Sequence, residues 1–171
     1  MLAMAGCSRN NSSQESGSAQ SADLRFRIDE DLVAPYVDFP GLGIAIRPPA
    51  GWESQEFPVQ EELPIEVLDL YVGPGPSILL IGMMETSGSA KETAPSLATS
   101  DDDERTDFVH NGITFHQIRR VTAEHISYSI LFDSPDENTD RPGILQFVIP
   151  TESAETIART VESSLGSVEP R

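Results

Sequence analysis

The feature that most constrains the fold is a change of hydrophobic period at Pro150. Before it, residues 126–132 place Ile, Tyr, Ile and Phe at alternate positions, which is the period of a half-buried strand. After it, apolar residues recur every three or four positions and predict the inward face of a helix: Ala154, Ile157, Val161 and Leu165. Strands followed by one amphipathic helix predict an α+β fold, an antiparallel sheet with the C-terminal helix packed on one face.

The other strands are predicted from short apolar runs between turn residues. Ile65–Val72 and 77–84 flank Gly73-Pro74-Gly75-Pro76, which predicts a hairpin. Asn111-Gly112 before Ile113–Val121 predicts another, and runs 113–121, 126–132 and 143–149 predict a meander. Residues 43–47 predict a strand that ends at Pro48-Pro49.

Residues 86–107 are polar and predict a long loop with one short helix. At the C-terminal helix we expect Thr151 to be the N-cap and Gly166 to end the helix. Glu152 and Glu155 fall in its first turn, where they complement the helix dipole.

The order of these elements resembles the PsbP-like fold, which includes small bacterial lipoproteins of the DcrB group. The resemblance covers residues 42–168 and is carried by Pro49, Gly51 and Trp52 in a "P-P-A-G-W" turn and by the closing helix "V-E-S-S-L-G-S-V". It implies that Trp52 is a packing residue. It also implies a binding or assembly protein rather than an enzyme, although fold alone is a weak guide to function.

Cys7 is the only cysteine, and Met4-Ala5-Gly6 before it resembles the lipobox of a bacterial lipoprotein. The resemblance implies lipid attachment at Cys7, with residues 1–6 the remnant of a signal peptide. Six residues are too few for a complete signal, so we expect a start codon further upstream or a clipped sequence.

Residues 8–22 are polar, and six of these fifteen are serine. Such a segment buries too little apolar surface to fold alone, so it is expected to be a flexible tether. We therefore expect a lipidated cysteine with its tether over residues 7–22 and a single PsbP-like domain over residues 23–171. This arrangement implies a cell-envelope protein, lipid-anchored and facing the periplasm or the exterior. The alternative is a soluble acidic protein with an incidental Cys7.

The net charge is −17, from 28 acidic and 11 basic residues. This charge excludes a nucleic-acid surface, since phosphates would be repelled, and argues against binding to anionic lipid. The composition resembles that of halophilic proteins, in which salt screens the repulsion. An acidic surface selected for a basic partner is the alternative.

No residue pattern predicts a metal or cofactor site. His110, His116 and His125 lack ligand spacing, and solvated surface histidines are expected. Asp136, Asn138 and Asp140 resemble the start of a calcium loop, but Arg141 replaces the required glycine, so an acidic hairpin loop is expected. The run 101–104 is expected to be solvated and self-repelling.

The sequence also lacks a nucleophile elbow and a phosphate-binding glycine loop. We therefore expect a non-enzymatic binding or accessory protein with a protein partner in the envelope and no cofactor. The alternative is a small-ligand carrier or an enzyme that uses a cleft between sheet and helix, with a histidine and a carboxylate converging in a pocket.

Overall fold

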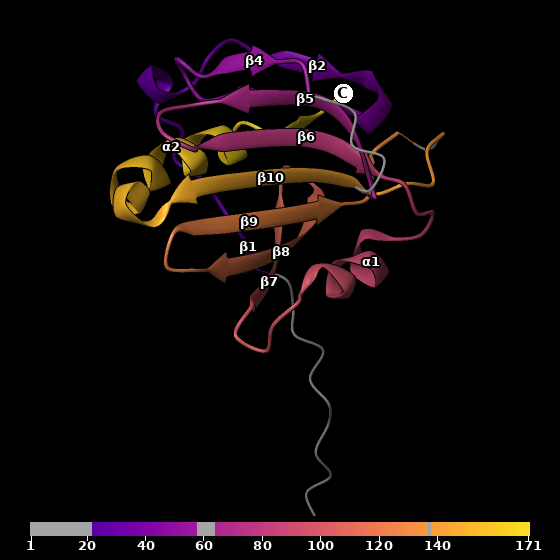
Figure 1. The fold of residues 1–171 in the computed structure, drawn as a ribbon. Coiled ribbons are helices and arrows are strands. Elements are labelled where there is room, and N and C mark those ends of the chain that lie inside the picture. Colours follow the sequence, from indigo (N-terminus) through magenta and orange to yellow (C-terminus); the bar gives the residue numbers. More distant parts are fainter. Residues whose placement is uncertain (1–21, 58–63, 137) are drawn as a thin grey trace, which may run out of the picture.

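The computed structural model describes residues 22–57, 64–136 and 138–171. They form one eight-stranded sheet and one three-stranded sheet (Figure 1). In spatial order the large sheet contains β1 (Ala22–Asp23), β7 (Glu104–His110), β8 (Ile113–Val121), β9 (His125–Phe132), β10 (Gly143–Pro150), β6 (Ile78–Met84), β5 (Ile65–Val72) and β4 (Glu53–Gln55). The small sheet contains β11 (Glu169–Pro170), β3 (Ile44–Ile46) and β2 (Val37–Phe39).

The central pairings confirm the predicted hairpins and meander. β5 and β6 pair across the Gly/Pro turn, and β8, β9 and β10 form an antiparallel meander. β7 and β8 are joined at Asn111 and Gly112, whose φ values of 49° and 79° fit a two-residue turn with left-handed backbone. The parallel pairing of β1 with β7 was not predicted, and it begins at Ala22, the last residue of the predicted tether.

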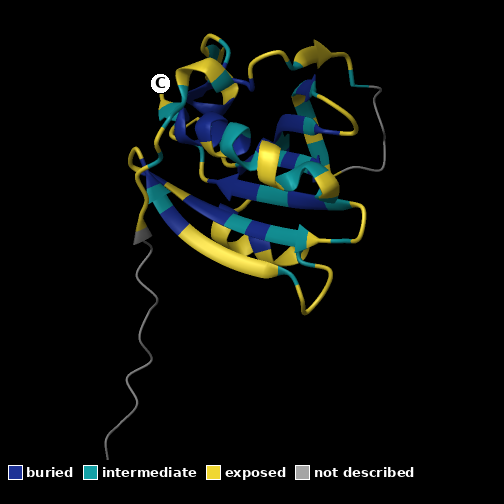
Figure 2. Cartoon of the chain, turned by 90° about the vertical axis from the view of Figure 1, so that its left-hand side faces the viewer, coloured by how far each residue is buried: buried dark blue, intermediate teal, exposed yellow. Residues whose placement is uncertain are grey.

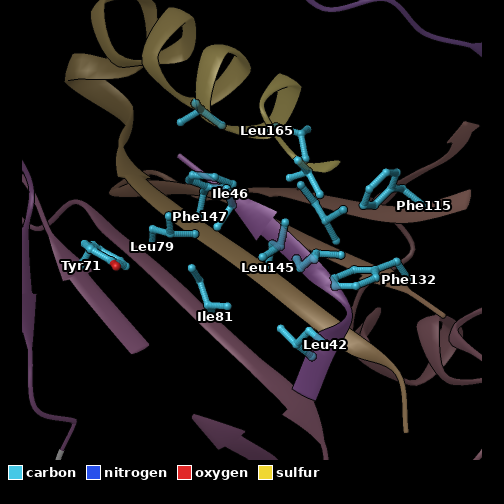
Figure 3. Packing of buried hydrophobic residues seen from close by; sticks show 14 of the residues in the cluster. Leu42, Ile46, Tyr71, Leu79, Ile81, Phe115, Phe132, Leu145, Phe147 and Leu165 are labelled. Atoms are coloured by element: carbon cyan, nitrogen blue, oxygen red, sulfur yellow. The ribbon is translucent and has the colours of Figure 1, made fainter. Parts of the chain in front are cut away.

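Helix α2 (Ala154–Gly166) packs on one face of the large sheet, which we call the inner face. Its predicted stripe is confirmed: Ile157, Val161 and Leu165 are buried, and Ala154 packs against the same cluster. Figure 3 shows this cluster between helix and sheet, with Phe115, Phe132 and Phe147 from three neighbouring strands. The small sheet covers the rest of the inner face through β3, all of which is buried. Figure 2 shows the burial concentrated between these layers.

The predicted start of α2 is wrong, whereas its predicted end at Gly166 is confirmed. A 3-10 turn (Thr151–Ser153) precedes the helix, and the Thr151 hydroxyl donates to the carbonyl of Thr122 at 3.1 Å instead of capping. Gly166 is the last helical residue, but it has no left-handed backbone. Its lack of a side chain matters for another reason, because a Cβ there would lie 2.4 Å from Cβ of Phe26.

Helix α1 (Ala90–Leu97) lies on the opposite, outer face, where Ala90 and Ala94 pack on β8 and β9. Ser89 and Glu92 form a capping box at its start. This is the short helix predicted within residues 86–107. The predicted loop is too long, however, because β7 begins at Glu104.

Two further 3-10 turns, Glu30–Leu32 and Pro40–Leu42, connect the N-terminal segments. Within the described ranges, no helix is long and apolar enough to cross a bilayer.

Candidate binding groove

A groove of about 700 Å³ lies at the β4 edge of the large sheet. It is lined by residues 54–57, by residues 65–70 of β5 and by Glu85, which follows β6. We call this cavity the β5 groove. Its volume is in the range of sites that hold a small ligand or a short peptide segment.

The groove exists because β4 is shorter than β5. Gln55 pairs with Leu70 and Glu53 with Val72, and the ladder between β4 and β5 ends there. Residues 65–69 of β5 therefore have β6 on one side and, in the described part of the chain, no strand on the other.

The backbone of this stretch presents hydrogen-bonding groups to the groove. The Glu85 N–H donates to the Pro64 carbonyl at 2.9 Å, so Pro64 directs its carbonyl toward β6. Because alternate residues of a strand direct their N–H and C=O to opposite sides, Ile65 and Val67 direct theirs toward the edge. An irregularity between Val67 and Asp69 places Leu68 in a bulge.

Apolar and acidic side chains of β5 lie on opposite faces of the sheet along the groove. Phe57, Ile65, Val67 and Leu70 belong to the outer-face cluster. Glu66 and Asp69 pair with Met83 and Ile81, both of which pack in the inner-face cluster. Glu56 and Glu85, just beyond the ends of β4 and β6, add two more carboxylates to the lining of the groove.

Two of the carboxylates have partners that fix their positions. The Ser54 hydroxyl and the Leu70 N–H donate to Oδ1 of Asp69 at 2.7 and 2.9 Å, which holds the chain just after the bulge. Burial, assisted by Asp69, raises the pKa of the neighbouring Tyr71. Glu66 accepts from Nη1 of Arg141 at 2.7 Å, so its charge is already neutralised in part.

The predicted alternative site, a cleft between sheet and helix, also exists. It measures about 220 Å³ and lies between α2 and strands β7 to β9, lined by apolar groups that include Phe26, Phe108 and Val161. This volume is below that of most ligand sites, and it holds a single carboxylate, Glu162, and no histidine.

The histidines do not converge, and two of them are buried, so the expectation of solvated histidines is wrong there. His110 is 8% exposed and His116 is 7% exposed. His110 lies at the predicted hairpin tip, with Nε2 2.8 Å from the carbonyl oxygen of Gly166 and Nδ1 3.1 Å from that of Leu24. Nδ1 of His116 lies 2.8 Å from Oδ1 of Asp107 on the outer face. That pair lines neither the β5 groove nor the cleft between sheet and helix.

The acidic run 101–104 is not simply solvated and repelling. The Asp103 side chain is 2% exposed and accepts from Nε and Nη2 of Arg120 at 3.0 and 2.9 Å. The Thr99 and Ser100 N–H groups donate to the same carboxylate, and Glu104 accepts from Arg119 at 2.8 Å. The guanidinium of Arg120 holds the pKa of Asp103 well below its usual range.

The loop after β9 is organised by its own side chains. The backbone and side-chain N–H groups of Asn138 donate to Oδ1 of Asp136 at 3.0 and 2.7 Å, and they lower the pKa of Asp136. The carbonyl of Asp140 accepts from Gly88. Across the described residues, no three His, Cys, Asp or Glu side chains lie close enough to hold a metal ion.

Trp52 is a packing residue, as the resemblance implied. Its indole lies on Gly73, where a Cβ would be 2.4 Å from the ring. Cys7 lies outside the described residues, as does the tether as far as residue 21.

The β5 groove was not among the sites predicted from the sequence. A signal was present, since two acidic residues, Glu66 and Asp69, interrupt the apolar run 65–70, but they line an open groove only because β4 ends at Gln55. The length of an edge strand depends on packing against residues that are distant in the sequence, so local residues do not predict it.

No protein-family profile matches the sequence, and no curated protein matches it either. Among solved structures, the solution structure of cyanobacterial PsbP (CyanoP) from Synechocystis sp. PCC 6803 is similar, with a TM-score of 0.57 and 10% identity. The similarity covers 82% of this chain and 94% of that chain. At this identity the likeness concerns the fold, and it confirms the fold class: the chain has a PsbP-like α+β fold.

Proposed function

We propose that this chain is a lipid-anchored, non-enzymatic binding protein of the cell envelope, which meets a partner protein through the β5 groove. The observation that supports binding most directly is the groove itself. It is open at a sheet edge, and its apolar and acidic side chains lie on separate faces. Such a surface can bind a partner protein without catalysing a reaction.

The arrangement of titratable groups supports binding over catalysis. An enzyme of this fold would bring a histidine and a carboxylate together in a pocket. His116 does meet a carboxylate, Asp107, but this pair lines neither the β5 groove nor the sheet–helix cleft, and His110 contacts two backbone carbonyls. The resemblance to the PsbP-like fold, whose members are mostly binding or assembly proteins, agrees with this proposal.

The anchor is proposed on Cys7 and its sequence context. A single acyl chain binds membranes only marginally, whereas the diacylglycerol of a bacterial lipoprotein gives lasting attachment. The tether, residues 8–22, would then hold the folded part away from the bilayer, facing the periplasm or the exterior. An acidic surface favours this separation because it is repelled by anionic lipid.

The anchor is tested by intact mass and membrane partitioning of the protein expressed from its native locus, beside a Cys7→Ala variant. We expect the native protein to carry the mass of a diacylglycerol and to sediment with membranes, and the variant to be released. If both proteins are unmodified and released from membranes, the lipid anchor is wrong, and a soluble binding protein is what remains of the proposal.

A further inference from the structure

The geometry points to the kind of segment that the β5 groove receives: an extended stretch of a partner protein, with alternating apolar and basic residues, added as a strand beside residues 65–69. This inference rests on the proposed function, because it specifies the partner at the same groove.

The backbone supplies the first argument. β4 runs beside β5 only as far as Leu70, and Ile65 and Val67 direct their N–H and C=O groups past its end. A chain that continues the line of β4 would satisfy these groups. Strand addition of this kind draws its affinity from main-chain hydrogen bonds and its specificity from alternate side chains.

The side chains supply the second argument. In an added strand, successive residues point to opposite faces of the sheet. Residues on the outer face would lie against Phe57, Ile65 and Val67, which form an apolar surface. Residues on the other face would lie on the side of Glu66 and Asp69, and the carboxylates of Glu56 and Glu85 also line the groove. The groove therefore selects a segment in which apolar and basic residues alternate.

Charge and edge length supply the third argument. Across the described residues, Glu66 has an ion-pair partner, Arg141, whereas Glu56 and Glu85 have none. The net charge of −17 attracts a basic segment from a distance and repels a second copy of this chain. The bulge at Leu68 and the short open stretch oppose edge-to-edge aggregation and restrict the site to a few residues.

The test uses the folded protein and three eight-residue peptide probes. One alternates valine and arginine, the second contains the same residues as a valine block and an arginine block, and the third alternates valine and glutamine. Affinity is measured by fluorescence anisotropy, and the site is mapped by amide hydrogen exchange and NMR shifts. We expect the alternating arginine peptide to bind at least about tenfold more tightly than either control, and to slow exchange at the Ile65 and Val67 amides.

A double variant, Glu56→Gln with Glu85→Gln, tests the acidic side. We expect it to weaken binding of the alternating arginine peptide about three- to tenfold, in line with two solvent-exposed ion pairs. Binding of the glutamine peptide should not change. The matched control, Asp101→Asn with Asp102→Asn, removes the same charge from the turn before β7 and should leave both affinities unchanged.

Three results would overturn the inference. Equal affinity for alternating and block peptides would show attraction by net charge alone. Unchanged exchange at Ile65 and Val67 would exclude strand addition. Slow exchange of both amides in the free protein would show that the edge is already hydrogen-bonded before any peptide is added. If a membrane partner is nevertheless crosslinked at Leu68, the proposed function stands and only the strand-addition inference fails.

Discussion

The imidazole of His110 joins the β7–β8 turn to the last residue of α2, with its Nε2 2.8 Å from the carbonyl oxygen of Gly166. The other ring nitrogen lies 3.1 Å from the carbonyl oxygen of Leu24, just after β1. One buried side chain thus links the start of the described chain, a hairpin and the end of the helix.

Replacing His110 should therefore destabilise three elements at once. We expect His110→Ala to lower the free energy of unfolding by about 1–3 kcal/mol, because it removes a buried ring that contacts the carbonyls of Gly166 and Leu24. The amide of Leu24, which donates to Val109 at 2.9 Å, should exchange faster as β1 loosens. His125→Ala, at a more exposed site beside Thr122, is the control. Equal losses in the two variants would be inconsistent with a linking role for His110.

The contact between Trp52 and Gly73 gives a second prediction. A Cβ on Gly73 would meet the indole at 2.4 Å, so Gly73→Ala should displace Trp52 and cost about 1–3 kcal/mol in chemical denaturation. It should also shift the tryptophan fluorescence to longer wavelength. Gly41→Ala is the matched control, because nothing lies within 4 Å of its added Cβ. A blue shift, or no shift, at Gly73→Ala would argue against the packing role.

The Asp103–Arg120 pair predicts the sign of a pH effect. Because Arg120 lowers the pKa of Asp103 in the folded state, the contribution of Asp103 is complete above the ordinary range of aspartate and declines as the pH falls below about 4. Below that pH the unfolded chain takes up a proton that the folded protein does not.

Urea unfolding of Asp103→Asn between pH 2 and 7 tests this relationship. We expect the variant to be less stable than the parent at pH 7 and to show a shallower loss of stability below pH 4. Asp102→Asn, one residue away and exposed, should follow the parent. The opposite order, with a difference between parent and variant that grows in acid, would contradict the assignment.

The charge of −17 predicts that salt stabilises the fold. Self-repulsion among 28 acidic residues is screened as the Debye length falls from roughly 10 Å at 0.1 M to about 3 Å at 1 M salt. We expect the melting temperature to rise from low to molar KCl. A melting temperature that stays constant or falls would count against halophilic adaptation and leave a basic partner as the explanation of the charge.

The sequence predicted what depends on local pattern. The Gly-Pro turn between β5 and β6 and the stripe 154–165 were found correctly, because strand alternation, turn chemistry and helix period are all local signals. His110 was misjudged because its two contacts lie 56 and 86 positions away in the sequence. The burial of Asp103 was not predicted for the same reason, since Arg120 reaches it from β8, 17 positions away.

The β5 groove was not predicted because it depends on where the neighbouring strand β4 ends. Its lining residues belong to three segments, and its shape follows from the end of β4 at Gln55 and the bulge at Leu68. Neither feature has a sequence signature of its own. Once the pairing is known, however, the register with β6 shows that Glu66 and Asp69 lie on the inner face and Ile65, Val67 and Leu70 on the outer face.

The most direct test of the proposed function is site-specific photocrosslinking in native membranes, with a benzophenone amino acid at Leu68 in the groove or at Val121 on β8. Both side chains are exposed, at 38% and 52%, and three strands separate β8 from β5. We expect a discrete adduct from Leu68 alone, and its loss when the alternating valine–arginine peptide is added in excess. Absence of an adduct at Leu68, or the same adducts from both positions regardless of the peptide, would contradict a partner-binding groove.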